Sequence, residues 1–214
     1  MWLRRCHLCQ RPAAEALCLT CWGQIVPLAE PQHVLRHTPW PHVHLAYAAY
    51  EPPLKTLLLD LKYRQARVLG LTLGRYLGQW YRAHWPLPDV LVPVPLHPQR
   101  QRERGYNQAE LLARGLAEVL DRPVLRALQR QKHTPPLYTL SPEERQQVLQ
   151  GVFALNPRWQ RRLAQQRILL VDDILTTGAT LLQAATILAD CSQKLISLSA
   201  ARALIADPLI FNRI

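Results

Sequence analysis

Apolar and polar positions fall into blocks along the chain that separate strands from helices. The clearest block starts with an apolar run at 168–171, continues through two adjacent carboxylates, Asp172 and Asp173, and a Thr/Gly segment, and ends in an apolar-periodic stretch at 181–188. A short apolar run bounded by turn residues is typical of a strand that is buried on both faces. The block therefore predicts a buried strand with an acidic tip, then a turn and the start of a helix.

Strand and helix patterns alternate over much of the chain. Apolar runs predict strands at 43–50, 89–95, 124–128, 152–155 and 194–200, and helical periodicity predicts helices at 54–63, 68–84, 109–120 and 181–189. Such alternation is typical of an α/β fold, in which helices cover both faces of a doubly wound, mainly parallel sheet. Ligands of this fold class bind at the carboxyl ends of the strands.

Two further patterns bear on packing. Gly70, Gly74 and Gly78 recur every four residues in the helix predicted at 68–84, which would allow another helix to approach closely. The segment 23–41 is rich in Pro and His and is interpreted as a connector. Four histidines in and near it are interpreted as loop residues, because a segment broken by prolines offers no single rigid face for a metal. They are His33, His37, His42 and His44.

The acid pair and the Thr/Gly segment have the composition of a sugar-phosphate site. A helix N-terminus offers unpaired N–H groups to a phosphate, Gly178 lets the backbone come close, and threonine hydroxyls add donors. Asp172 and Asp173 are placed to accept hydrogen bonds from vicinal ribose hydroxyls. The alternative is a turn that only caps the helix, but two acids at the end of a buried strand are costly without a function. The segment lacks the Lys of a Walker loop and the glycines of a dinucleotide loop.

A second strand–loop–helix block carries positive charge. The strand predicted at 89–95 leads into a loop with three guanidiniums and a glycine, and the helix predicted at 109–120 follows. The loop residues are Arg100, Arg102, Arg104 and Gly105. Guanidiniums bind phosphate groups through paired hydrogen bonds, which suits a diphosphate. A solvated basic turn is the alternative.

Four of the five cysteines lie near the N-terminus with the spacing C-x2-C-x8-C-x2-C. They are Cys6, Cys9, Cys18 and Cys21. Each C-x2-C pair can present two thiolates from one tight turn, called a knuckle, and two knuckles complete a tetrahedral zinc shell. Four thiolates leave no open position on the metal, so we expect structural rather than catalytic zinc. Disulfides are the alternative, which a cytoplasmic setting disfavours. Haem attachment would need a histidine where Gln10 or Trp22 stands.

The composition describes a globular protein with an excess of positive charge. Of the 214 residues, 49% are hydrophobic, and 26 Lys and Arg against 15 Asp and Glu give a net charge of +11. This charge favours phosphorylated metabolites, nucleic acid or an anionic membrane face as partners, although an inert basic surface has the same composition. No apolar run approaches the ~20 residues of a membrane span. The first residues lack the core of a signal peptide, so we expect a cytoplasmic protein.

The segment VDDILTTGAT at 171–180 closely resembles the phosphoribosyl-pyrophosphate (PRPP) motif of type I phosphoribosyltransferases. The resemblance implies that Asp172 and Asp173 hold the ribose hydroxyls of PRPP, which binds with Mg²⁺. It implies that the next residues cradle the 5′-phosphate: Thr176, Thr177, Gly178, Ala179 and Thr180. It also implies that the arginine loop takes the pyrophosphate. The segment 129–150, with Arg130 and Lys132, would close over the ligand as a lid, and its residues 141–144 form a capping box that predicts a helix start.

Nearly the whole chain resembles the ComF family of competence proteins (ComFC or GntX-like). The matching parts are the cysteine knuckle, LKYR at 61–64, VPVPLHP at 92–98, RERGYNQAELLA at 102–113 and the PRPP motif. The resemblance implies a zinc knuckle and linker at 1–41 and a phosphoribosyltransferase-like domain at 42–214. It implies a role in the uptake or use of external DNA, with single-stranded DNA and proteins of the uptake machinery as expected partners.

Two functions fit these patterns. The first is a ComF-like protein of DNA uptake that binds PRPP or a related ribose phosphate. The second is a salvage phosphoribosyltransferase with an unidentified acceptor. A DNA-binding adaptor with a vestigial pocket is disfavoured, because such a pocket would not need both acids. In purine phosphoribosyltransferases an Asp of the phosphate loop assists at the base. Thr176 takes that place here, so we assign no catalytic residue.

Overall fold

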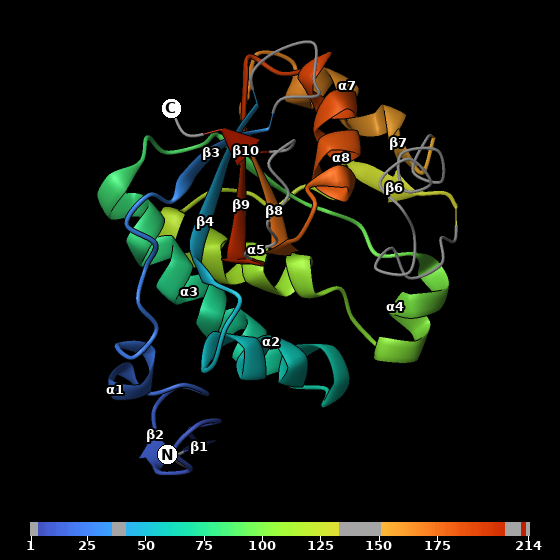
Figure 1. Cartoon of the computed structure of the whole chain (residues 1–214). Helices are drawn as coiled ribbons and strands as arrows, with labels where there is room; N and C mark the ends of the chain where they lie inside the picture. The colour runs from blue at the N-terminus through green and yellow to red at the C-terminus, as the bar shows by residue number, and fades with distance from the viewer. Residues whose placement is uncertain (1–3, 36–41, 133–150, 204–210, 213–214) are drawn as a thin grey trace.

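The computed structural model describes residues 4–35, 42–132, 151–203 and 211–212. Figure 1 shows a central sheet with helices on both sides and the N-terminal segment below it. The elements are, in chain order, β1 (Arg4–Arg5), β2 (Pro12–Ala13), α1 (Leu19–Trp22), β3 (Gln32–Leu35), β4 (His42–Ala49), α2 (Leu54–Tyr63), α3 (Arg67–His84), β5 (Val90–Pro93), α4 (Pro98–Arg104), α5 (Gln108–Leu120), β6 (Leu128–Arg130), β7 (Phe153–Leu155), α7 (Pro157–Leu163), β8 (Arg167–Leu175), α8 (Ala179–Ala189), β9 (Lys194–Arg202) and β10 (Phe211–Asn212).

The main sheet has six strands in the order β10-β3-β4-β9-β8-β5. β4, β9, β8 and β5 are parallel to one another, whereas β3 is antiparallel to both of its neighbours. Because parallel strands end at one edge, the segments that follow the neighbouring strands β8 and β5 emerge side by side. The predicted α/β class with a mainly parallel sheet is confirmed.

Alternating residues of β8 point into two separate cores. Leu169 and Val171 belong to the core that α3 and α5 cover, and Ile168 and Leu170 belong to the core that α8 covers. A strand buried on both faces explains why the run at 168–171 is apolar throughout. Helices on both faces make the sheet doubly wound, as the alternation of patterns predicts (Figure 1).

The helices α3 and α5 cross at glycines. A Cβ on Gly74 would lie 2.3 Å from the carbonyl oxygen of Leu112, and a Cβ on Gly115 would lie 2.2 Å from that of Leu71. No side chain fits at either position, so the close approach expected from the glycine spacing is confirmed at Gly74. Gly115, which faces it from α5, was not expected.

The N-terminal segment shares its core with the main sheet. Trp22 stacks on Tyr47 with 4.8 Å between ring centroids and packs on Tyr76 at the same distance. The Tyr76 hydroxyl donates a hydrogen bond to the carbonyl of Leu17 at 2.7 Å. Glu15 accepts hydrogen bonds from Arg75. The cysteine knuckle is therefore docked on α3 and β4 rather than tethered loosely.

Two expectations about local structure are wrong, and one helix was not expected. The arginine loop contains a helix, α4, which starts at Pro98 behind a cap from His97 and ends at Gly105. The strand expected at 124–128 lies at Leu128–Arg130, and Val124 makes only an isolated bridge. The helix α7 had no predicted counterpart. The capping box at 141–144 and most of the expected lid lie outside the described residues.

The interpretation of the histidines as loop residues is also wrong. The connector contains β3, which pairs with β4, so His33, His42 and His44 lie on adjacent strands and are buried. Hydrogen bonds join Ser197 Oγ to both His42 Nε2 and His44 Nδ1, at 2.8 and 2.7 Å. Ser199 Oγ lies 3.0 Å from His44 Nε2. His37 lies outside the described residues. The serine partners on β9 thus make it possible to bury His42 and His44.

Candidate functional site

The acid pair lies inside β8 rather than at its tip. The strand continues for two residues after Asp173, to Leu175, which corrects the expected boundary. The Asp173 N–H donates a hydrogen bond to Asp172 Oδ1 at 2.8 Å, and the Asp173 side chain is 13% exposed. Both carboxylates are thus partly buried near the carboxyl edge of the sheet, beside the segment that follows β5.

The environment resists a full negative charge on Asp172. Burial, and next the negative charge of Asp173, raise the pKa of Asp172 to about 7. The Asp172 carboxyl group is therefore partly protonated near neutral pH. A cation or a hydroxyl donor that reached them would be favoured, because it would stabilise the second negative charge.

Lys62 at the end of α2 supplies one such cation. Its Nζ lies 2.9 Å from Asp173 Oδ2. Burial opposes the charge of Lys62, but the carboxylates of Asp173 and Asp172 outweigh it and raise the pKa of Lys62. Lys62 was not assigned to the site from the sequence. Its only signal is its place in LKYR, in the last turn of a helix.

Two arginines of α4 face the same region. Arg100 and Arg104 are one helical turn apart and share a face, whereas Arg102 lies between them and points elsewhere. Burial lowers the pKa of Arg104, and Asp173 opposes that shift. The Arg104 guanidinium also lies 5.7 Å from the ring centroid of Tyr63, whose side chain is 73% exposed. The structure thus brings Arg104 to the acid pair but not Arg102.

Arg130 on β6 also lies near the acid pair. Burial and the nearby charge of Arg100 lower the pKa of Arg130, and the carboxylate of Asp172 opposes them. Arg130 therefore lies within electrostatic reach of both α4 and β8. Lys132, the other residue expected in the lid, lies beside Gly151.

Gly105 has a structural role next to this cluster. It ends α4 with a positive φ of 78°, and its carbonyl accepts a hydrogen bond of 2.8 Å from Arg67 Nη2. Tyr106 follows and donates its hydroxyl hydrogen to the carbonyl of Leu61, next to Lys62. These contacts fix the start of α5 to the end of α2, so the LKYR and RGYN segments meet at the acid pair.

The Thr/Gly segment leads directly into α8. Gly178 is the N-cap residue with a φ of 76°, and no side chain makes a capping hydrogen bond there. Ala179 and Thr180 lie in the first helical turn, and Thr176 is exposed. No threonine side chain caps the helix, although Gly178 of the same turn is its N-cap residue. N–H groups at such an uncapped start suit an anion.

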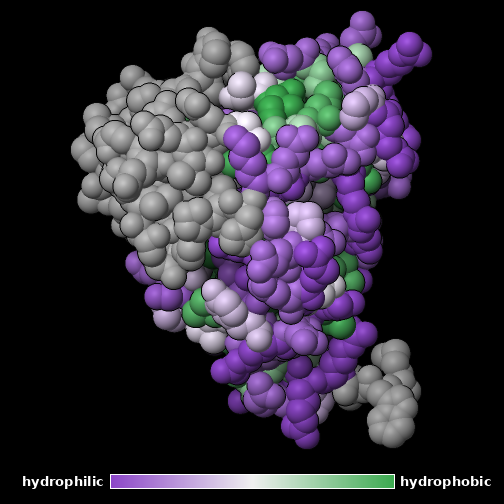
Figure 2. Space-filling model, turned by 90° about the vertical axis from the view of Figure 1, so that its right-hand side faces the viewer, coloured by the Kyte–Doolittle hydropathy of each residue, from purple (hydrophilic) through white to green (hydrophobic). Residues whose placement is uncertain are grey.

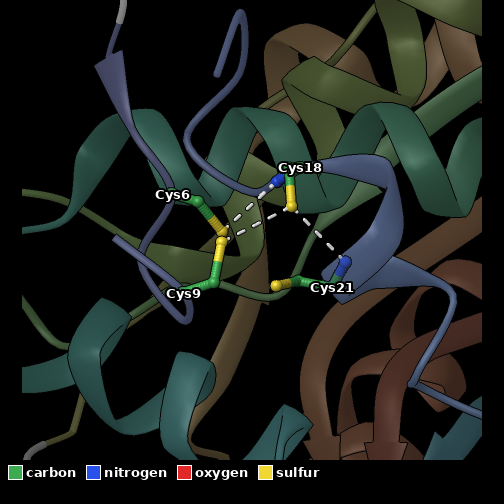
Figure 3. Close-up of side chains that lie close together, drawn as sticks. All are labelled: Cys6, Cys9, Cys18 and Cys21. Carbon is green, nitrogen blue, oxygen red and sulfur yellow. Dashed lines mark hydrogen bonds between the residues drawn. The ribbon is translucent and has the colours of Figure 1, made fainter. Parts of the chain in front are cut away.

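The four N-terminal cysteines converge on one point. Their sulfurs all lie within 4.8 Å of one another, as Figure 3 shows. The Sγ atoms of Cys9 and Cys18 are 3.8 Å apart. A tetrahedral zinc with bonds of about 2.3 Å places its sulfurs about 3.8 Å apart, so the arrangement fits this metal. None of the five cysteines forms a disulfide.

The pKa values of the knuckle favour a bound cation. Burial opposes ionisation of Cys6, but backbone N–H groups, first that of Cys18, outweigh it and lower the pKa of Cys6 to about 6. Burial and the neighbouring sulfurs raise the pKa of Cys21 to about 12. A thiolate at Cys21 is therefore favoured only beside a positive charge.

Comparison with known proteins decides the family. The chain is 30% identical over 193 residues to the DNA utilization protein YhgH of Escherichia coli O6:H1, a match that covers 86% of this chain and 83% of that protein. The chain belongs to the ComF/YhgH family. It is also 38% identical over 138 residues to competence protein F of Haemophilus influenzae, which covers 62% of this chain and 60% of that protein. Competence protein ComFC of Bacillus subtilis is 29% identical over 180 residues, covering 82% of this chain and 68% of that protein.

Solved structures similar to this member of the ComF/YhgH family include two enzymes whose names refer to phosphoribosyl groups. Glutamine PRPP amidotransferase from B. subtilis aligns with 61% of this chain and 25% of its own, at 19% identity and a TM-score of 0.42. Adenine phosphoribosyltransferase from Leishmania donovani aligns with 79% of this chain and 64% of its own, at 16% identity and a TM-score of 0.37. No protein-family model matches the chain.

No helix among the described residues is both long enough and apolar enough to cross a membrane.

Proposed function

We propose that this ComF/YhgH-family protein binds PRPP, or a related ribose 5-phosphate, at the carboxyl edge of its sheet. One observation carries the proposal: Asp172 and Asp173 lie half-buried beside Lys62, with arginines from α4 and β6 around them. Carboxylates in this position accept hydrogen bonds from hydroxyl groups, and the surrounding cationic side chains bind phosphates. A sugar phosphate presents both kinds of group at once.

Each part of the ligand has a matching part of the chain. The ribose 2′ and 3′ hydroxyls would donate hydrogen bonds to Asp172 and Asp173. The 5′-phosphate would accept from the N–H groups of the Thr/Gly segment, 176–180, at the start of α8. The diphosphate would lie toward Arg100 and Arg104. Mg²⁺, when bound with the diphosphate, would neutralise part of its charge.

Two further assignments belong to the proposal. The cysteine knuckle holds a structural Zn²⁺, which the fit of its four sulfurs supports. The protein takes part in DNA uptake or utilization and contacts single-stranded DNA, alone or with proteins of the uptake machinery. The names of its relatives, a competence protein and a DNA utilization protein, and the net charge of +11 support this part.

Calorimetry with PRPP and Mg²⁺ tests the ribose-phosphate site. We expect the unchanged protein to bind, and the double variant Asp172→Asn, Asp173→Asn to lose binding while it keeps its thermal stability. Arg102→Ala is the matched control, since Arg102 points away from the acid pair, and it should bind within about twofold of the unchanged protein. Absence of heat from the unchanged protein would remove the proposal. Pyrophosphate release with a panel of acceptor bases would separate a salvage transferase from a protein that only binds PRPP.

A further inference from the structure

The helix α7 presents a group of basic side chains around one aromatic ring. Arg158, Arg161 and Arg162 are exposed, and Trp159 is half-buried against the core, where Leu163 anchors the helix. The guanidinium of Arg158 lies 4.5 Å from the Trp159 ring centroid and that of Arg162 lies 5.5 Å from it. The three arginines occupy positions i, i+3 and i+4 and therefore share one side of the helix.

No acid among the described residues forms a salt bridge with this surface. The stretch 151–171 contains no Asp or Glu. Several arginines outside α7 are paired with acids: for example, Arg167 contacts Asp89 at 2.6 Å, and Arg75 contacts Glu118 at the same distance. Within the described ranges, no salt bridge joins a carboxylate to an arginine of α7. Three like charges held close together favour an anionic partner.

This surface is separate from the acid pair. α7 ends four residues before β8 begins and so lies at the amino end of that strand, whereas the acid pair lies near its carboxyl end. Figure 1 shows α7 beside α8 at the top of the view and α4 at the lower right. Figure 2 turns the right-hand side of Figure 1 toward the viewer, and the surface outside the grey atoms is largely hydrophilic there. A ligand on α7 therefore need not compete with one at the acid pair.

We propose that α7 is a binding surface for single-stranded nucleic acid. The three guanidiniums contact successive phosphates, and an unpaired base stacks against the Trp159 and guanidinium planes. An anionic membrane would favour exposed apolar side chains that insert into lipid, but the apolar Leu163 of α7 is buried. An acidic peptide would use the charges and leave the aromatic ring without a role. The proposal rests on the DNA role proposed above but not on the ribose-phosphate site.

Fluorescence anisotropy with a labelled oligo-dT tests this surface. The variant Arg158→Ala, Arg161→Ala, Arg162→Ala should bind about tenfold more weakly at low salt. The slope of log affinity against log salt concentration should become shallower by about 2, because each of the three lost phosphate contacts contributes about 0.7. A charge-matched variant, with Arg4, Arg5 and Arg11 of the knuckle changed to Ala, should bind within about twofold of the unchanged protein. Equal losses in the two variants would overturn the proposal, because general charge would then explain binding.

A second measurement examines the aromatic contact. Binding of oligo-dT should quench less tryptophan fluorescence in Trp159→Phe than in the unchanged protein, and an abasic oligonucleotide should quench little in either. Equal quenching in the two proteins would overturn the base contact. If the unchanged protein binds no single-stranded DNA, this inference and the DNA role both fail. The PRPP titration still reports on the ribose-phosphate site by itself.

Discussion

Replacing Gly74 with alanine has two opposite effects on stability at the crossing of α3 and α5: helix propensity favours the alanine, and packing disfavours it. Alanine in a helix interior is favoured over glycine by about 1 kcal/mol. At this crossing, however, the new Cβ would lie 2.3 Å from the carbonyl oxygen of Leu112 and 2.9 Å from the Cα of Gly115. Both atoms belong to the backbone, so neither can rotate away and the helices must separate. Overpacking of this kind costs about 3 kcal/mol at the upper end of its usual range.

The net effect is a loss of about 2 kcal/mol in the free energy of unfolding, after the propensity gain is subtracted. For a chain of this size each kcal/mol lowers Tm by roughly 2–4 °C, so we expect a fall of about 4–8 °C. Urea unfolding followed by circular dichroism measures the loss. Gly23→Ala is the control, because its Cβ meets nothing closer than 3.4 Å, and it should change stability by less than about 0.5 kcal/mol. A Gly74→Ala protein as stable as the unchanged one would refute the reasoning.

Three further predictions concern charge and metal. Removing zinc with a chelator should lower the Tm of the whole chain in one transition, because Cys6, Leu17 and Cys21 share a core with the main sheet; a separate early transition seen by calorimetry would contradict this. Lys62→Met removes the cation nearest the acid pair and should raise the apparent pKa of Asp172 by about one unit in an NMR titration, with Lys55→Met as the control. The protein should lose stability as pH falls from 6.5 toward 4. Burial lowers the pKa of His33 and of His42 to about 4 and that of His44 well below its usual value. The unfolded chain therefore takes up protons at these histidines before the folded chain does. Each histidine then lowers the free energy of unfolding by about 1.4 kcal/mol per pH unit. The raised pKa of Asp172 acts in the opposite direction, but Asp172 is one group and the histidines are three. Urea midpoints that rise on acidification would contradict the prediction.

Local patterns predicted those elements that depend on local causes. The helix α2 begins and ends where its periodicity predicts, and the glycine spacing marks the side of α3 that meets α5. The helix α4 was missed although local signals were present: His97 caps it, Pro98 opens it and Gly105 ends it. A short polar segment with three arginines, however, is also typical of a loop.

Features that depend on distant partners were not predictable in the same way. His42 and His44 are buried because Ser197, more than 150 positions away, bonds to both of them. Lys62 joins the site because α2 ends beside β8, a relation that only the assembled sheet creates. In contrast, the four cysteines converge as expected, since their spacing already dictates two knuckles.

A crystal structure of the protein with PRPP and Mg²⁺ tests the central claim most directly. The account predicts density for the ribose with its 2′ and 3′ hydroxyls against Asp172 and Asp173, and for the 5′-phosphate at the N-terminus of α8 beside Gly178. Density for PRPP at another surface, or a ligand turned so that its diphosphate lies on α8 and its ribose hydroxyls point away from the acid pair, would contradict it.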